Sequence, residues 1–140
     1  MITRKIHIIS LAFLFLFQSQ DIHAQSINSN EKNRILFIFD ASQSMLSRWQ
    51  SGRKIDIAKE LLSEMVDSLK YIDNLELGLR IYGHRSPYPP KDCDDTYLEV
   101  DFSKSEFAAE MIKKELAVVR SRGTTPLAKS LEEGAKDFPD

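Results

Sequence analysis

The sequence has one cysteine, no long hydrophobic run and no excess of positive charge. With Cys93 alone, the 140 residues cannot build an internal disulfide framework. The longest apolar stretch, residues 8–17, is about half the length that a membrane-spanning helix needs. A net charge of −2 at pH 7 argues against nucleic acid as a partner. Five glycines and a hydrophobic content of 42% exclude a collagen-like or disordered chain and favour one globular domain with a short appendage.

The appendage lies at the amino terminus. Arg4 and Lys5 precede the apolar stretch at residues 8–17, and Ala24 offers a small residue for cleavage, a pattern typical of a secretory signal peptide. A membrane anchor is the alternative, but the stretch is too short to span a bilayer. We expect an exported protein, periplasmic or extracellular, with no stable membrane anchor after cleavage. The expected division is a signal peptide at 1–24, a flexible leader at 25–33 and a folded domain at 34–140.

Strands and helices are expected to alternate in this domain. The apolar run at residues 35–39 predicts a buried strand, with neighbouring strands and with helices over both faces. Apolar residues spaced three and four apart in residues 54–70 predict an amphipathic helix. Apolar residues at every second position of residues 75–81 predict a strand with unequal faces. This order predicts an α/β sheet with parallel strands.

The second half of the domain continues the pattern. A loop rich in proline and charge at residues 84–96 leads into a short strand at residues 97–100. Ser103 with Glu106 has the signature of a capping box for a second helix. Thr125 is expected to cap a third helix that has Pro126 at its first position. The buried face of that helix is predicted from its apolar spacing to consist of Leu127, Leu131, Ala135 and Phe138.

The end of the first strand carries the main indication of function. Asp40, Ser42 and Ser44 alternate along the segment that follows residues 35–39. In parallel sheets, ligands bind beyond the carboxyl ends of the strands. A carboxylate and two hydroxyls are ligands that a hard divalent cation such as magnesium accepts. An ordinary polar turn, with serines capping the next helix, is the alternative.

These segments resemble a known family. The Asp-x-Ser-x-Ser motif at residues 40–44 is similar to that of von Willebrand factor type A domains. Residues 123–127, Gly-Thr-Thr-Pro-Leu, resemble their second metal-site loop, and residues 82–85 and 93–95 resemble exported bacterial members. The resemblance implies a Rossmann-like, doubly wound sheet, mostly parallel with a short antiparallel edge strand. The family has a further aspartate and strand beyond the threonine, so we expect the domain to be incomplete at its carboxyl end.

The resemblance also implies a metal-ion-dependent adhesion site made by Asp40, Ser42, Ser44 and Thr125. The ion would be magnesium, with manganese or calcium as alternatives, and the partner a protein that offers an Asp or Glu carboxylate. Hydroxyl ligands neutralise little of a divalent charge, so such a site attracts an incoming carboxylate. Asp137 and Asp140 are expected to be poor substitutes for the further aspartate. Without the missing strand, we expect an uncovered sheet edge, marginal stability and weak metal binding.

Two other functions compete with this binding module. A haloacid-dehalogenase-like phosphatase would use Asp40 as its nucleophile, but it needs a carboxylate where this chain has Ser42. A truncated remnant without a working site is the third possibility. We therefore expect a binding protein and no enzyme. His84 and Arg85 are interpreted as loop residues.

Three further features of the sequence have simpler interpretations. The acidic cluster at residues 92–95 is interpreted as solvated charge, because it lacks the spacing of a calcium loop. Cys93 is either a free thiol or a partner for a cysteine outside this sequence. Trp49 either contacts a partner or covers the start of the first helix.

Overall fold

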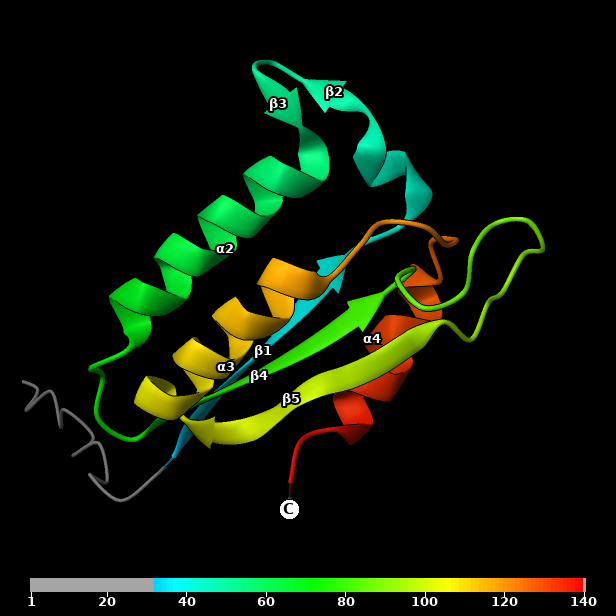
Figure 1. Ribbon diagram of the computed structural model, residues 1–140. Helices are drawn as coiled ribbons and strands as arrows, with labels where there is room; N and C mark the ends of the chain where they lie inside the picture. Colours follow the sequence, from blue (N-terminus) through cyan, green and yellow to red (C-terminus); the bar gives the residue numbers. More distant parts are fainter. Residues whose placement is uncertain (1–31, 140) are drawn as a thin grey trace, which may run out of the picture.

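A computed structural model describes residues 32–139, which form a three-stranded mixed sheet with helices on both faces (Figure 1). Its elements in chain order are β1 (Asn33–Asp40), the 3-10 helix η1 (Gln43–Leu46), β2 (Arg48–Trp49), β3 (Gly52–Arg53), α2 (Lys54–Leu69), β4 (Leu75–Tyr82), β5 (Thr96–Lys104), α3 (Ser105–Val118) and α4 (Leu127–Lys136). The expected signal peptide at 1–24 and nearly all of the leader at 25–33 lie outside the described residues. Among the helices of residues 32–139, none has the length and apolar character to cross a membrane.

The sheet has the order β1-β4-β5. β1 runs parallel to β4, with Phe37 opposite Leu79, and α2 makes the crossover between them. β5 runs antiparallel to β4. The predicted α/β class and the antiparallel edge strand are therefore confirmed. β5 is longer than the predicted residues 97–100, because pairing continues as far as Lys104, which lies opposite Glu76.

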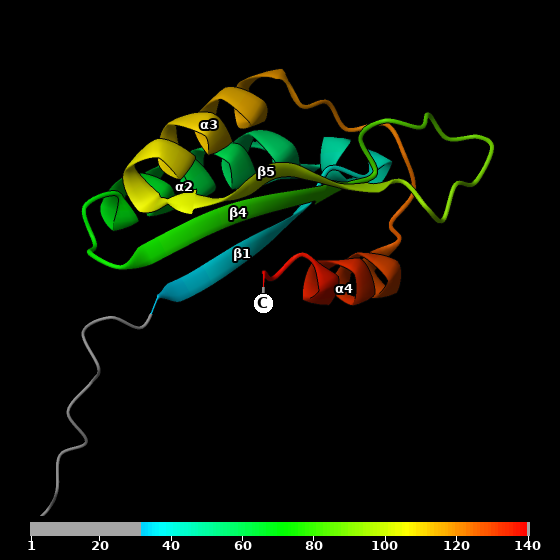
Figure 2. The same ribbon diagram turned by 90° about the horizontal axis from the view of Figure 1, so that it is seen from below.

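Helices α2 and α3 cover one face of the sheet, and α4 lies against the other (Figure 2). Leu77 and Leu79 of β4 are fully buried in the core between the sheet and the helix pair. Val66 of α2 and Ile112 of α3 belong to the same core cluster, and both are fully buried. The two-helix face is therefore a dry apolar core of the ordinary kind.

The two faces of β4 are unequal, as predicted, but the face that carries the charged residues is mostly buried as well. Arg80 is buried, and its guanidinium donates two hydrogen bonds of 2.7 Å to the Asp137 carboxylate, just beyond α4. A charge in an amphipathic strand usually points to water, but here the helix that covers it brings the opposite charge. Asp137 is thereby engaged in an ion pair.

Helix α4 turns a different side to the sheet from the one predicted. Ser130 and Gly134 are its buried residues, whereas the predicted buried residues Leu127, Leu131, Ala135 and Phe138 are exposed. A Cβ on Gly134 would lie 3.1 Å from the Ile38 side chain, so small residues set the close approach of helix and sheet. The ring of Phe138 still packs on Phe102, with centroids 4.8 Å apart. Helical spacing thus identified an apolar stripe, but the stripe does not face the sheet.

Both predicted helix caps are also wrong. Ser103 pairs with Leu77 within β5, and α3 begins at Ser105 without a side-chain cap. At the start of α4 the N-cap position is Pro126, so Thr125 lies one residue before the N-cap. The hydroxyl of Ser105 instead donates to the carbonyl oxygens of Lys70 and Ile72, which ties the α2–β4 turn to α3.

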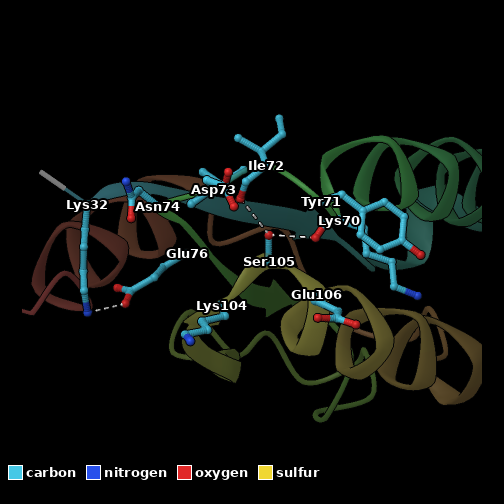
Figure 3. A pocket seen from close by; sticks show the side chains of 11 residues that line it. Lys32, Lys70, Tyr71, Ile72, Asp73, Asn74, Glu76, Lys104, Ser105 and Glu106 are labelled. Carbon is cyan, nitrogen blue, oxygen red and sulfur yellow. Dashed lines mark hydrogen bonds and ion pairs between the residues drawn. The ribbon is translucent and has the colours of Figure 1, made fainter. Parts of the chain in front are cut away.

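That turn borders a cavity of about 420 Å³ at the amino-terminal end of β4 (Figure 3). Its lining mixes lysines with acidic side chains, and two of the lining residues are paired, since Lys32 donates to Glu76 at 2.7 Å. The charges balance, and Ser105 is occupied by the two carbonyl groups. This cavity lies at the opposite end of the strands from Asp40.

The outer edge of β1 carries no partner strand within residues 32–139. Ile35, the first residue of the apolar run at residues 35–39, is 37% exposed. The expectation of an uncovered edge is confirmed for the described residues, while the expectation of strands on both sides of β1 is not. The middle strand of this sheet is β4.

Candidate functional site

Asp40 ends β1 at the carboxyl edge of the sheet, opposite Tyr82 of β4. The backbone N–H of Ser42 donates to Asp40 Oδ1 at 2.7 Å, so an Asx turn fixes the carboxylate. Burial raises the pKa of Tyr82, and the charge of Asp40 and a hydrogen bond to it raise that pKa further. Tyr82 therefore remains a protonated donor to Asp40.

Ser42 and Ser44 bring two hydroxyl groups together beside this carboxylate. Ser42 is 1% exposed, and its Oγ lies 3.1 Å from Oγ of the exposed Ser44. Ser42 occupies the N-cap position of η1 but makes no side-chain cap bond, and α2 begins only at Lys54. The alternative in which these serines cap the following helix is therefore wrong. The turn role of Asp40 remains real and is compatible with ligand binding.

The segment between α3 and α4 returns to the same place. Ser42 and Gly123 form an isolated parallel bridge, and Gln43 N–H donates to the Gly123 carbonyl at 2.8 Å. Thr124 uses its hydroxyl to bond the carbonyl of Asp92. Thr125 is exposed, and its hydroxyl makes no hydrogen bond with the other described residues. The structure thus places the Thr125 loop beside the two serines.

Gly83, directly after β4, lets the loops meet. Its φ is +71°, and a Cβ there would lie 2.4 Å from the Thr124 carbonyl and 2.7 Å from Ser42 Cα. Its own carbonyl accepts hydrogen bonds from the N–H groups of Arg122 and Gly123. Only a residue without a side chain permits this approach. Gly83 is therefore the residue around which the site is assembled.

Asp95 helps to hold these loops together, and the prediction that its charge is solvated is wrong. The side chain is fully buried and accepts hydrogen bonds from the backbone N–H groups of Arg85 and Ser86. A Cβ on Gly123 would lie 2.6 Å from Asp95 Oδ2. Asp94 is exposed, as expected, whereas Asp92 is half-buried. Sequence reasoning could not single out Asp95 within the acidic cluster.

His84, Arg85 and Cys93 behave as loop residues. His84 Nε2 lies 2.8 Å from Glu99 Oε1, and Arg85 donates to the same carboxylate at 2.7 Å. The Arg85 guanidinium also lies 3.9 Å from the centre of the Tyr97 ring. These contacts fasten the loop to β5. Cys93 is a free, exposed thiol.

The arrangement fits a hard cation with few charged ligands. Within residues 32–139 there is no cluster of three or more His, Cys, Asp or Glu residues that would hold a metal. Two oxygens bound at right angles to magnesium lie about 3.0 Å apart, given bonds of about 2.1 Å. The 3.1 Å between the two serine hydroxyls matches this spacing. The donor set is therefore one carboxylate with hydroxyls, and Asp40, Ser42, Ser44 and Thr125 are the residues that could supply it.

Sequence reasoning missed Tyr82, Gly83 and Asp95 as parts of the site. A glycine directly after a strand was a usable signal, because such glycines often permit a close backbone approach. Tyr82 follows from register alone, since parallel pairing places it opposite Asp40. Trp49, for which two roles were open, is 57% exposed and lies beside the start of α2.

Comparison with known proteins places the fold more firmly than the function. No family model matches the chain. An uncharacterized protein of Bacillus subtilis, YwmD, is 28% identical over 106 residues, which cover 74% of this chain and 46% of that protein. The chain therefore spans less than half the length of this curated relative.

Solved bacterial structures share the fold at low sequence identity. BatB from Bacteroides thetaiotaomicron superposes with a TM-score of 0.55 at 18% identity, covering 76% of this chain and 46% of that one. The PilB minor pilin of Streptococcus sanguinis superposes with a TM-score of 0.62 at 18% identity, covering 81% of this chain and 28% of that one. An aerotolerance-related membrane protein of Bacteroides fragilis superposes with a TM-score of 0.54 at 16% identity, covering 76% of this chain and 47% of that one. The described residues therefore have a mixed α/β fold, compatible with a Rossmann-like sheet, that these bacterial proteins share.

Proposed function

We propose that this chain is part of an exported module that binds a carboxylate of a partner protein through a divalent cation. The cation is magnesium, or manganese or calcium in its place, and its ligands are Asp40, Ser42, Ser44 and Thr125. The observation that carries the proposal is the meeting of the two serine hydroxyls, 3.1 Å apart, with the Thr125 loop at the Ser42–Gly123 bridge. The module is of the von Willebrand factor type A kind, and its similarity to BatB supports this.

The chemistry of the ligands favours binding over catalysis. One carboxylate leaves most of a divalent charge uncompensated, so the ion retains affinity for an acidic side chain from outside. The phosphatase alternative needs a second carboxylate at position 42, where Ser42 is buried and hydrogen-bonded to Ser44. His84, the nearest candidate base after β4, is engaged with Glu99. The proposed role is therefore adhesion or interaction without a chemical step.

The proposed location is outside the cytoplasm, in the periplasm or beyond. The signal-peptide pattern at residues 1–24 supports it, as does the fold shared with a protein described as an aerotolerance-related membrane protein. The partner protein would carry an accessible Asp or Glu.

Binding of Mn²⁺ to the full chain, measured by water-proton relaxation, tests the metal site. Asp40→Ala should weaken binding at least about 10-fold, because it removes the only charged ligand. Ser44→Ala, at an exposed position that threatens the fold less, should weaken it by a smaller factor. Asp73→Ala removes an exposed carboxylate at the far end of the sheet and should change nothing. Wild-type affinity in both Asp40→Ala and Ser44→Ala would overturn the proposal.

A further inference from the structure

A shallow apolar groove lies next to the proposed metal site. It has a volume of about 500 Å³ and is lined by Met45, Trp49, Lys54, Ile57, Ala58 and Leu61. Trp49 is 57% exposed and Leu61 56%. We call it the Trp49 groove. Large apolar side chains held open to solvent in a concave surface are typical of binding sites.

The groove is built by features that the core does not need. Helix α2 buries Ile55, Leu62 and Val66 toward the sheet, so Leu61 belongs to a second, outward stripe. The short β2–β3 hairpin places Trp49 over the beginning of this stripe. Gln50 at its turn has a φ of 51°, a conformation that non-glycine residues adopt uncommonly. The hairpin therefore presents Trp49 and does not bury it.

The charge around the groove is positive at the end nearest the metal site. Arg53 is paired with Asp56 at 2.7 Å. Arg48 in the hairpin and Lys54 in the groove wall have no ion-pair partner among the described residues. Glu60 and Glu64 lie further along α2, away from the hairpin. An occupant with an apolar side chain and negative charge at the hairpin end fits this pattern best.

The groove begins one residue along the chain from the proposed metal site. Met45, which lines the groove, is the residue directly after Ser44, and consecutive Cα atoms lie about 3.8 Å apart. We propose that the Trp49 groove receives an apolar side chain from the same acidic partner segment whose carboxylate reaches the cation. This proposal rests on the proposed function and adds to it the kind of partner, a peptide segment with an acidic and an apolar residue close together.

Trp49 is the only tryptophan of the chain, so its fluorescence reports on the groove directly. The probes are blocked glycine-based peptides with one Glu and one Leu separated by one, two or three glycines. The matched peptides have Ser in place of Leu, or Gln in place of Glu. With Mg²⁺ and the full chain, at least one Glu-Leu peptide should shift Trp49 emission to the blue and protect it from acrylamide. Its affinity should exceed that of the Ser peptide about 10-fold, as expected for burial of one aliphatic side chain.

Two leucines of nearly equal exposure provide the variant and its control. Leu61→Ser should reduce the affinity for the Glu-Leu peptide about 10-fold, since it removes an apolar wall of the groove. Leu131→Ser, at a 55% exposed position on α4, should leave the affinity unchanged. Equal effects of the two substitutions would overturn the assignment of the groove.

The remaining outcomes separate this proposal from the one on which it rests. Mg²⁺-dependent binding of a Glu peptide without any change at Trp49 would overturn the groove proposal and leave the metal site standing. Protection of Trp49 by Leu peptides that is equal with EDTA and in Asp40→Ala would support the groove as a docking site and overturn the metal-bridged function. Protection that grows with protein concentration in the absence of peptide would overturn the proposal in favour of a second copy as occupant.

Discussion

The two faces of the sheet are covered in different ways. Between the sheet and helices α2 and α3, aliphatic side chains such as Leu79 of β4 and Ile112 of α3 form a continuous core. On the α4 side, the sheet buries Arg80, which pairs with the carboxylate of Asp137. The residues of α4 that are buried there are Ser130 and Gly134. Many weak apolar contacts stabilise the packing on the first face. On the second face, one ion pair and a close backbone approach are the main features. Apolar periodicity therefore locates partners on the first face only.

The largest expected effect comes from breaking the ion pair of the α4 face. Asp137→Ala leaves the buried guanidinium of Arg80 without its partner and should lower the free energy of unfolding by about 3–5 kcal/mol. Urea denaturation followed by circular dichroism measures this. Replacing both residues, Arg80→Met with Asp137→Leu, should bring stability back to within about 1 kcal/mol of the wild type. A double variant as unstable as the single one would show that the pair is not the main cause.

Truncating one side chain in the core of the two-helix face is expected to lower the free energy of unfolding by slightly less. Leu79→Ala removes a fully buried side chain and should lower the free energy of unfolding by about 2–5 kcal/mol. Leu131→Ala removes the same atoms from the exposed stripe of α4 and should change it by less than about 0.5 kcal/mol. The same denaturation experiment compares them. A large cost at Leu131 would mean that the stripe is covered in solution.

Overpacking tests how closely α4 approaches the sheet. Gly134→Leu would push a side chain against Ile38 and Leu36, whose atoms already lie 3.1 and 3.2 Å from the position of a Cβ. We expect a loss of about 1–3 kcal/mol. Ala135→Leu, one residue further along and exposed, is the matched control and should be neutral within about 0.5 kcal/mol. Equal results for the two would contradict the observed rotation of α4.

The smallest expected effect concerns the solvent side of α4. Hydrogen bonds from Lys129 and Lys136 lower the pKa of Glu133 to about 2. A lowered pKa stabilises the folded state above the unfolded value of about 4.3, and this contribution disappears as the pH falls toward 2. Glu133→Gln should therefore flatten the pH dependence of the urea midpoint between pH 4.5 and 2 by a small amount. High salt should reduce the difference, because the pairs are exposed.

Much of the fold could be predicted because the spacing of apolar residues within a single strand or helix indicates that element. The run at residues 35–39 and the spacing in residues 54–70 correctly predicted β1 and α2. Helix α4 shows why the rest could not be predicted. Its strongest apolar stripe is exposed, and its orientation depends on Gly134 and on the pairing of Arg80 with Asp137, 57 positions apart. A partner so distant along the chain leaves no periodic signal.

The candidate site divides in a similar way. Asp40, Ser42 and Ser44 were predictable because three oxygen-bearing side chains follow a buried strand at alternate positions. Asp95 was not, because its burial depends on Gly83 and Gly123 leaving room for the loops around it. The metal ligands themselves stay a prediction until binding is measured.

Gly83 has a consequence for how this sequence can vary. Its carbonyl accepts hydrogen bonds from the backbone N–H groups of Arg122 and Gly123, and a Cβ at this position would lie only 2.7 Å from Ser42 Cα and 2.4 Å from the Thr124 carbonyl oxygen. In a library in which positions 82–86 are randomised and folded variants are selected, position 83 should therefore return glycine almost alone. Its neighbour Arg85, which works through a replaceable side chain, should return several residues. Position 83 should therefore tolerate fewer substitutions than any other position in this loop.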